Sequence, residues 1–221
     1  EHIGKEKHNK WRVKPKDFEK QMKWFYDNKW NSFTISELIK LDEIPKKSFL
    51  VTFDDGYEDN FINAFPILKK YNFKATIYLV PNQSINHWEE KNTSVLSNLL
   101  NNEQILQMQN TGLIEFGSHT LSHVNLSTIN DEQLLIELKK SKEEIEKITR
   151  KECEAFAYPY GKFDDKIIQA VEEIGYKNAT VVKRGLFEKN DNPFIIKRIG
   201  ILGTESFVDF LLKVTRIRNK L

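Results

Sequence analysis

The sequence predicts a single α/β domain in which a parallel sheet curls into a barrel. Short, β-rich apolar runs alternate with segments of helical periodicity, the pattern expected of βα units. No internal repeat or low-complexity linker divides the 221 residues, a length that buries a sizeable core, so we expect one domain over residues 1–221. Strands alternating with helices also fit a large open sheet, and the barrel is the preferred of the two architectures.

The expected strands are apolar runs rich in β-branched and aromatic residues. They are Ser32–Ile35, Ser48–Phe53, Phe73–Val80, Leu113–Gly117, Glu154–Tyr158, Asn178–Val182 and Phe194–Ile199.

Three amphipathic segments predict helices between these strands. Phe18, Met22 and Phe25 share one helical face. A long helix is expected from about Asp131 to Arg150, and a third over Asp164–Ile174, which Gly175 ends at the position that favours glycine.

Composition excludes several classes of protein. With 34 Lys and Arg against 32 Asp and Glu, the net charge is only +2, which argues against disorder and against a nucleic acid partner. The single cysteine, Cys153, excludes an intramolecular disulfide framework and a cysteine-based zinc site. No apolar run approaches the roughly 18–20 residues needed to cross a bilayer, so we expect no transmembrane segment.

Two clusters of reactive side chains follow expected strands directly. Asp54 and Asp55 come after the run Phe49–Val51, and His119 and His123 come after Leu113–Phe116. The carboxyl ends of parallel strands share one rim of a barrel, so we expect both clusters to meet there.

The chemistry of these residues points to a metal site. His119 and His123 are four residues apart, the spacing of one helical turn, and a carboxylate completes a set of two imidazoles and one oxygen that suits Zn²⁺ or Co²⁺. Side chains of adjacent residues in an extended chain point opposite ways, so one of Asp54 and Asp55 should bind metal while the other accepts a proton from water. This describes metal-assisted amide hydrolysis.

Plainer interpretations stand beside this one. An Asp-Asp-Gly sequence is common in turns, and a His-x-x-x-His pair is common on solvated helix faces or at a helix start capped by a residue such as Ser118. The later segment around Tyr158 and Tyr160 also reads as a turn with core aromatics.

Three motifs in order resemble the first three motifs of the NodB-homology polysaccharide deacetylases, carbohydrate esterase family 4. They are Thr52-Phe53-Asp54-Asp55-Gly56, His119-Thr120-Leu121-Ser122-His123 and Tyr158-Pro159-Tyr160-Gly161. The resemblance extends over roughly residues 11–199 and implies a distorted (β/α)7 barrel. The runs Ala75–Val80 and Phe156–Gly161 are similar to the branch that deacetylates poly-β-1,6-N-acetylglucosamine.

The resemblance implies a role for each matching residue. Asp54 is expected to be the general base, and Asp55, His119 and His123 the metal ligands. The backbone N–H of Tyr160 is expected to form the oxyanion hole. The implied cofactor is a divalent metal, Zn²⁺ first, with Co²⁺ or Ni²⁺ as alternatives.

The sequence departs from the family pattern at two positions. An arginine that steadies the base is absent from the third motif, and Arg198 is the candidate replacement, although it also reads as a solvated cation at a strand end. No histidine follows His123, so the usual general acid is missing; His2 is the candidate, with an upstream residue or a disordered terminus as alternatives.

Side chains that contact substrate are harder to assign. Tyr158 and Trp88 are the candidates, Trp88 by stacking on a pyranose ring, and loop packing is the alternative for Trp88.

The implied function is hydrolysis of N-acetyl groups on N-acetylglucosamine units of a polysaccharide, with poly-β-1,6-N-acetylglucosamine as the favoured substrate. Peptidoglycan, chitin oligomers or a small amide, and a carbohydrate-binding barrel without catalysis, remain alternatives. We expect the protein outside the cell or in the cell envelope, with any targeting segment absent from this chain. Its oligomeric state is open.

Overall fold

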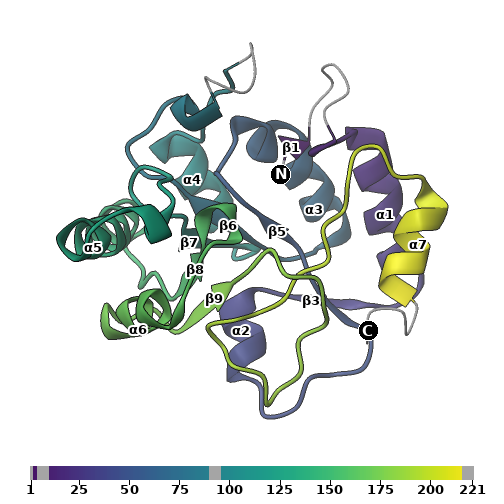
Figure 1. Cartoon of the computed structure of the whole chain (residues 1–221). Coiled ribbons are helices and arrows are strands. Elements are labelled where there is room, and N and C mark those ends of the chain that lie inside the picture. Colours follow the sequence, from purple (N-terminus) through teal and green to yellow (C-terminus); the bar gives the residue numbers. More distant parts are fainter. Residues whose placement is uncertain (1, 4–9, 90–95, 216–221) are drawn as a thin grey trace.

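The structure is a computed structural model that describes residues 2–3, 10–89 and 96–215, the first two as backbone only. Five parallel strands form its central sheet, and their spatial order follows their order in the chain. In Figure 1 these strands occupy the centre, surrounded by helices. They are β5 (Thr52–Phe53), β6 (Ala75–Leu79), β7 (Ile114–Ser118), β8 (Ala155–Ala157) and β9 (Asn178–Thr180).

A separate two-stranded sheet directly precedes β5 in the chain. β3 (Asn31–Phe33) pairs in parallel with β4 (Ser48–Leu50), and β5 begins two residues later. The carbonyl of the intervening Val51 accepts a hydrogen bond from Thr76 of β6. The expected strand Ser48–Phe53 therefore exists in two halves that serve neighbouring sheets. A further pair, β1 (His2–Ile3) and β2 (Arg12–Val13), lies outside the main sheet.

Two expected strands differ from the structure. Ser32–Ile35 ends early because the Thr34 hydroxyl and Glu37 form a capping box that starts α2 (Ile35–Lys40). Phe194–Ile199 is not a full strand. It meets β9 at one parallel bridge, Thr180 to Ile196, and so only partly continues the sheet. The predicted fold class is confirmed as a distorted barrel that stays incomplete on this side.

The helices cover the outside of the sheet. They are α1 (Pro15–Asp27), α2, α3 (Phe65–Tyr71), α4 (Asn102–Gln109), α5 (Asp131–Thr149), α6 (Asp165–Glu173) and α7 (Phe207–Thr215), with short helical turns η1 (Asn60–Ala64), η2 (His87–Glu89), η3 (Leu126–Thr128) and η4 (Pro159–Gly161).

The two helices with predicted bounds lie within one residue of them. α5 ends before a left-handed Arg150, and Gly175, with φ +101°, lies two residues after Glu173, the last residue of α6. None of the helices in the described part of the chain combines the length and apolar character that a membrane crossing requires.

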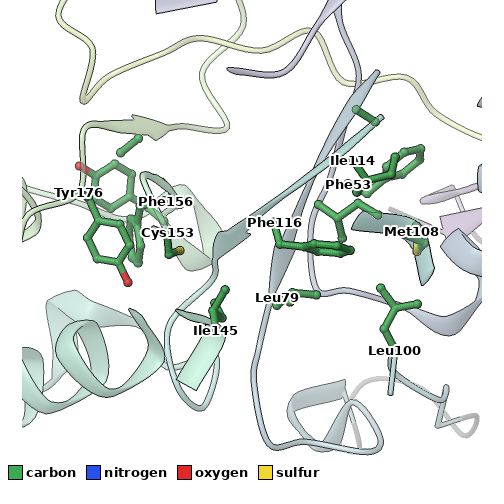
Figure 2. Packing of buried hydrophobic residues seen from close by; sticks show 14 of the residues in the cluster. Phe53, Leu79, Leu100, Met108, Ile114, Phe116, Ile145, Cys153, Phe156 and Tyr176 are labelled. Carbon is green, nitrogen blue, oxygen red and sulfur yellow. The ribbon is translucent and has the colours of Figure 1, made fainter. Parts of the chain in front are cut away.

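Alternate residues of the strands divide the core into two clusters. Ile77 and Leu79 of β6 belong to the larger cluster, between sheet and helices, while Tyr78 belongs to a small one with Ile35 and Ile196. Figure 2 shows the larger cluster, where Phe53, Leu79 and Phe116 pack together with residues of the covering helices. The face of the sheet that carries Tyr78 is therefore the one toward the barrel interior. The reactive residues lie at the carboxyl ends of these strands.

Candidate active site

Asp55, His119 and His123 meet at the carboxyl ends of β5 and β7. Nε2 of His119 lies 3.4 Å from Oδ1 of Asp55, and Nε2 of His123 lies 3.2 Å from the same oxygen. One ligand atom from each residue falls within 4.8 Å of the others, and both imidazoles are buried. The three residues that sequence analysis grouped as metal ligands are therefore brought together.

A left-handed turn separates the two aspartates. Asp55 has φ +73° and Gly56 has φ +69°, and a Cβ on Gly56 would lie 2.8 Å from a methyl carbon of Leu79. The turn directs Asp55 to the imidazoles, while Asp54 pairs with Arg198. As expected, only one of the two adjacent carboxylates lies beside the imidazoles, and the other points elsewhere.

The histidine pair is not on a helix, and the expectation of one helical turn is wrong. Residues 119–125 form an irregular loop in which Thr120 has φ +69° and His123 has φ +57°. Left-handed backbone at these two residues breaks any α-helix, and the loop itself brings the imidazoles together, with ring centroids 4.9 Å apart.

The protonation states fit a bound cation. Burial lowers the pKa of His119 to about 4, so its imidazole is neutral at pH 7. Its Nδ1–H donates to the Ala157 carbonyl at 2.7 Å, which leaves the lone pair of Nε2 facing Asp55.

Two hydrogen-bond acceptors, an imidazole nitrogen and a carboxylate oxygen, therefore face each other in a buried place. Oδ1 of Asp55 has no hydrogen-bond partner among the described residues. A cation between Asp55, His119 and His123 satisfies all three, and the set of two nitrogens and one oxygen suits a borderline divalent metal. The residues present fit the metal that the family resemblance implied.

Arg198 holds Asp54 by two parallel hydrogen bonds. Its two terminal nitrogens donate to Oδ1 at 2.6 Å and Oδ2 at 2.8 Å, and Nε donates to the Val181 carbonyl. Burial opposes the ionised form of Asp54, but the Arg198 guanidinium outweighs it, so the pKa of this carboxyl lies well below its usual range. Arg198 therefore contacts Asp54, the residue that it was predicted to steady, and is not a solvated cation.

Tyr160 and Trp88 surround the exposed side of the histidines. Tyr160 has φ +58°, and its hydroxyl lies 3.2 Å from Nδ1 of His123. The Trp88 ring lies flat on the His123 ring, with centroids 4.5 Å apart and planes 17° apart. Both predicted residues therefore lie at the site.

Comparison with known proteins agrees with this geometry. A family profile described as polysaccharide deacetylase matches residues 42–179. The chain belongs to the polysaccharide deacetylase family. The family and the class of enzyme predicted from the sequence are confirmed.

Two similar proteins are also named as deacetylases. This chain is 32% identical to a putative polysaccharide deacetylase, YxkH, of Bacillus subtilis, over 87% of this chain and 67% of that protein. It is 31% identical to a poly-β-1,6-N-acetyl-D-glucosamine N-deacetylase of Staphylococcus aureus, over 85% of this chain and 67% of the relative. The chain thus spans about two thirds of the length of these relatives.

Solved structures of deacetylases superpose on nearly the whole chain. BC0361, a polysaccharide deacetylase from Bacillus cereus, is 31% identical and gives a TM-score of 0.82 over 97% of this chain and 67% of that one. The Streptococcus pyogenes deacetylase PplD, solved in complex with acetate, is 25% identical and gives 0.84 over 97% and 95%.

One predicted site residue of the deacetylase, Tyr158, does not lie as expected, and a second, His2, is not tested. Tyr158 is 0% exposed, so its predicted contact with substrate is wrong. Its ring packs on Phe156 and Phe163, and its hydroxyl donates to the Phe194 carbonyl, because the side chain faces the helix layer. The side chain of His2 lies outside the described residues, and only its backbone is placed, paired with Arg12.

Sequence analysis missed the side chains that hold the Trp88 turn. Asn86 is fully buried; its amide nitrogen donates to Glu89 at 2.9 Å and to the Tyr57 hydroxyl at 3.3 Å, and its oxygen accepts from the Ser97 N–H. The sequence signal for this role of Asn86 was weak, because a polar stretch without periodicity resembles a solvated loop. These bonds fix the turn that lays Trp88 against His123.

A cavity of 620 Å³ adjoins the metal-ligand group of the deacetylase. Asp55 and Gly56 form one wall, and the loops after β6 and before α4 form the others. Its polar lining is rich in amide side chains, and its volume lies in the range of ligand sites. The lining residues are Asp55, Gly56, Leu79–Ser84, Leu99–Glu103, Ile105 and Ile148.

Proposed function

We propose that the chain is a metal-dependent N-deacetylase of poly-β-1,6-N-acetylglucosamine. One observation carries the proposal: a buried group of Asp55, His119 and His123 lies beside an Asp54 that Arg198 holds ionised. A protein that only binds sugar needs no such carboxylate. The geometry therefore favours hydrolysis over the alternative of a carbohydrate-binding barrel.

The residues divide the reaction between them. A divalent metal held by Asp55, His119 and His123 would act as a Lewis acid on the acetyl carbonyl and favour deprotonation of water. Asp54, kept ionised and oriented by Arg198, accepts the proton of the water that attacks the carbonyl carbon.

Charge then develops on the acetyl oxygen, and the Tyr160 N–H donates to it. The bond between carbon and nitrogen breaks, giving acetate and a free amine. His2 stays the proposed donor of the proton that the amine requires.

Zn²⁺ is the proposed metal. Two imidazole nitrogens and one carboxylate leave a fourth, open position in the tetrahedral geometry that Zn²⁺ prefers in catalytic sites. The same donors suit Co²⁺ and Ni²⁺.

Three observations support the choice of polysaccharide. The Staphylococcus aureus relative is named for poly-β-1,6-N-acetyl-D-glucosamine. The cavity beside Asp55 has room for a neighbouring sugar unit. Trp88 and the 54% exposed Tyr160 offer aromatic faces for pyranose rings. Peptidoglycan and chitin oligomers are the alternative substrates.

We propose that the protein acts in the cell envelope or outside the cell, where a polymeric substrate would be accessible to it. Fractionation of the source cells, with detection of the protein by antibody, tests this; a purely cytoplasmic signal would contradict it.

The experiment measures metal content and acetate release together. The wild-type chain, Asp54→Asn and the matched surface variant Asp42→Asn are incubated with oligomers of β-1,6-linked N-acetylglucosamine, chitin oligomers and peptidoglycan. We expect acetate from the first substrate, a loss of about 10²–10⁴-fold in Asp54→Asn and no change in Asp42→Asn. All three chains should keep their metal, because Asp54 is not in the ligand group.

Each other result has a defined meaning. Acetate release from chitin or peptidoglycan alone would show that this polymer, and not poly-β-1,6-N-acetylglucosamine, is the substrate. Full activity in Asp54→Asn would show that Asp54 is not the general base. Oligomer binding without acetate from any substrate would favour the carbohydrate-binding barrel.

A further inference from the structure

Glu137 is a buried carboxylate on the apolar face of α5. It is 5% exposed, and it interrupts the stripe formed by Leu134, Leu138 and Ile145. Glutamate is rarely buried without partners. Its partners here all belong to the loop that carries the two histidines.

Three hydrogen bonds connect Glu137 to the centre of that loop. Oε2 accepts from the backbone N–H groups of Leu121 and Ser122, each at 2.9 Å. Oε1 accepts from the Ser122 hydroxyl at 2.5 Å. Both bonded residues lie between His119 and His123, so the carboxylate fixes the backbone that connects the two imidazoles.

Ser141, one turn further along α5, holds the start of the same loop. Ser118 precedes His119 directly, and its hydroxyl donates to Oγ of Ser141 at 2.8 Å. Ser141 in turn donates to the Leu138 carbonyl at 3.0 Å. Two polar side chains at positions i and i+4 of one helix thus hold the loop at two points.

The loop has a conformation that needs such support. Thr120 and His123 both have positive φ, which is unfavourable for residues with a Cβ and persists only where surrounding contacts impose it. The loop makes no helical turn that would set the spacing of the histidines. Ser141 and Glu137 of α5 bond to residues on both sides of Thr120 in this loop.

We propose that Glu137 is a positioning residue that sets the spacing of His119 and His123 and thereby the metal affinity of the site. The inference rests on the proposed function, since it assumes that these histidines bind metal. It adds a residue that touches neither metal nor substrate. Hydrogen-bond partners of metal ligands commonly change metal affinity by about 10–100-fold when they are removed. Glu137 acts one step further out, on the backbone that connects two ligands.

The test compares metal binding in Glu137→Gln with that in Glu143→Gln, an exposed position on the same helix. The glutamine oxygen can still accept from both N–H groups, but its amide nitrogen cannot accept from the Ser122 hydroxyl, and the negative charge that strengthens all three bonds is lost. Dissociation constants for Zn²⁺ and Co²⁺ are measured by competition with a chromophoric chelator, and the visible spectrum of the Co²⁺ form reports ligand geometry.

We expect a dissociation constant raised about 10–100-fold and an altered Co²⁺ spectrum in Glu137→Gln, with wild-type values in Glu143→Gln. Wild-type affinity and spectrum in a folded Glu137→Gln would overturn the proposal, even if that variant unfolds at a lower temperature.

A second pair keeps the test decisive if Glu137→Gln does not fold. Ser122→Ala removes the hydroxyl that bonds Oε1, while Ser122→Thr retains one. We expect weaker metal binding in the alanine variant and recovery in the threonine variant. Equal affinities in both would overturn the inference. A wild-type chain that binds neither metal would instead overturn the metal site itself.

Discussion

Arg198 forms a bidentate ion pair with Asp54 across 144 residues of sequence. The pair connects the segment Phe194–Ile199, which lies beside β9 at one edge of the central sheet, to the end of β5 at the other edge. The third motif, Tyr158–Gly161, contains no arginine, and the cation beside Asp54 comes from a later part of the chain.

Replacing Arg198 by lysine should reduce catalysis while leaving metal bound. Lysine keeps the charge but cannot make two parallel hydrogen bonds, and one charge-assisted bond contributes about 1.5–3 kcal/mol. We expect kcat/KM to fall roughly 10- to 100-fold. Steady-state acetate assays and metal analysis check this, with the exposed Arg150→Lys as control. Unchanged kcat/KM would show that the pair is only structural.

Removing metal should lower the stability of the chain. A ligand that binds only the folded state stabilises it by about 2.7 kcal/mol at a concentration 100-fold above its dissociation constant. Thermal unfolding before and after treatment with a chelator, and after return of Zn²⁺, measures the shift. Asp55→Asn should show no such shift, because it loses a ligand. A shift of equal size in that variant would place the ion elsewhere.

Trp88 should influence substrate binding through its ring. The ring covers His123 at the exposed side of the site, so Trp88→Ala removes a stacking face and one wall around the imidazole. Aromatic contacts contribute about 0.5–1.5 kcal/mol, so KM should rise roughly 2- to 10-fold. Trp88→Phe, which keeps a ring, should restore most of the loss. KM values equal to that of the wild type in both variants would show that the Trp88 ring only packs the loop.

Gly117 should not tolerate a side chain. A Cβ at this position would lie 2.6 Å from the Tyr78 ring and 2.7 Å from the Ala155 carbonyl, on the two neighbouring strands. Overpacking of this kind costs about 1–3 kcal/mol, which urea unfolding of Gly117→Ala should reveal. Gly200→Ala, where nothing lies within 4 Å, is the control. Equal stabilities would mean that the strands move apart without cost.

Cys153 should be unreactive in the folded protein. It is 1% exposed, and burial raises the pKa of its thiol well above the usual value, so little thiolate forms at pH 8. A chromogenic disulfide reagent should label it only after denaturation. Rapid labelling under native conditions would show that the region around β8 opens readily.

Much of the chemistry was readable from the sequence. Asp54, Asp55, His119 and His123 each follow an apolar run, and parallel strands place such residues on one rim whatever the details of the helices. The bounds of α5 and α6 were also predictable, because periodicity and the glycine after α6 are properties of neighbouring residues.

Only the tertiary structure showed how the side chains are directed. Tyr158 and Tyr160 are two residues apart, yet one is buried behind the sheet and the other is exposed beside His123. The left-handed backbone of Tyr160 causes this difference, and no composition rule predicts it for a tyrosine.

The sequence by itself determined which functional groups the chain carries and which end of the sheet they occupy. The tertiary structure decided between the two interpretations of Arg198, by pairing it with Asp54, and it revealed Glu137 as the partner of the histidine loop. The physical reason is that strand and helix signals arise from residues close in the chain. Salt bridges and buried hydrogen bonds instead depend on distances between segments that only the folded molecule brings together.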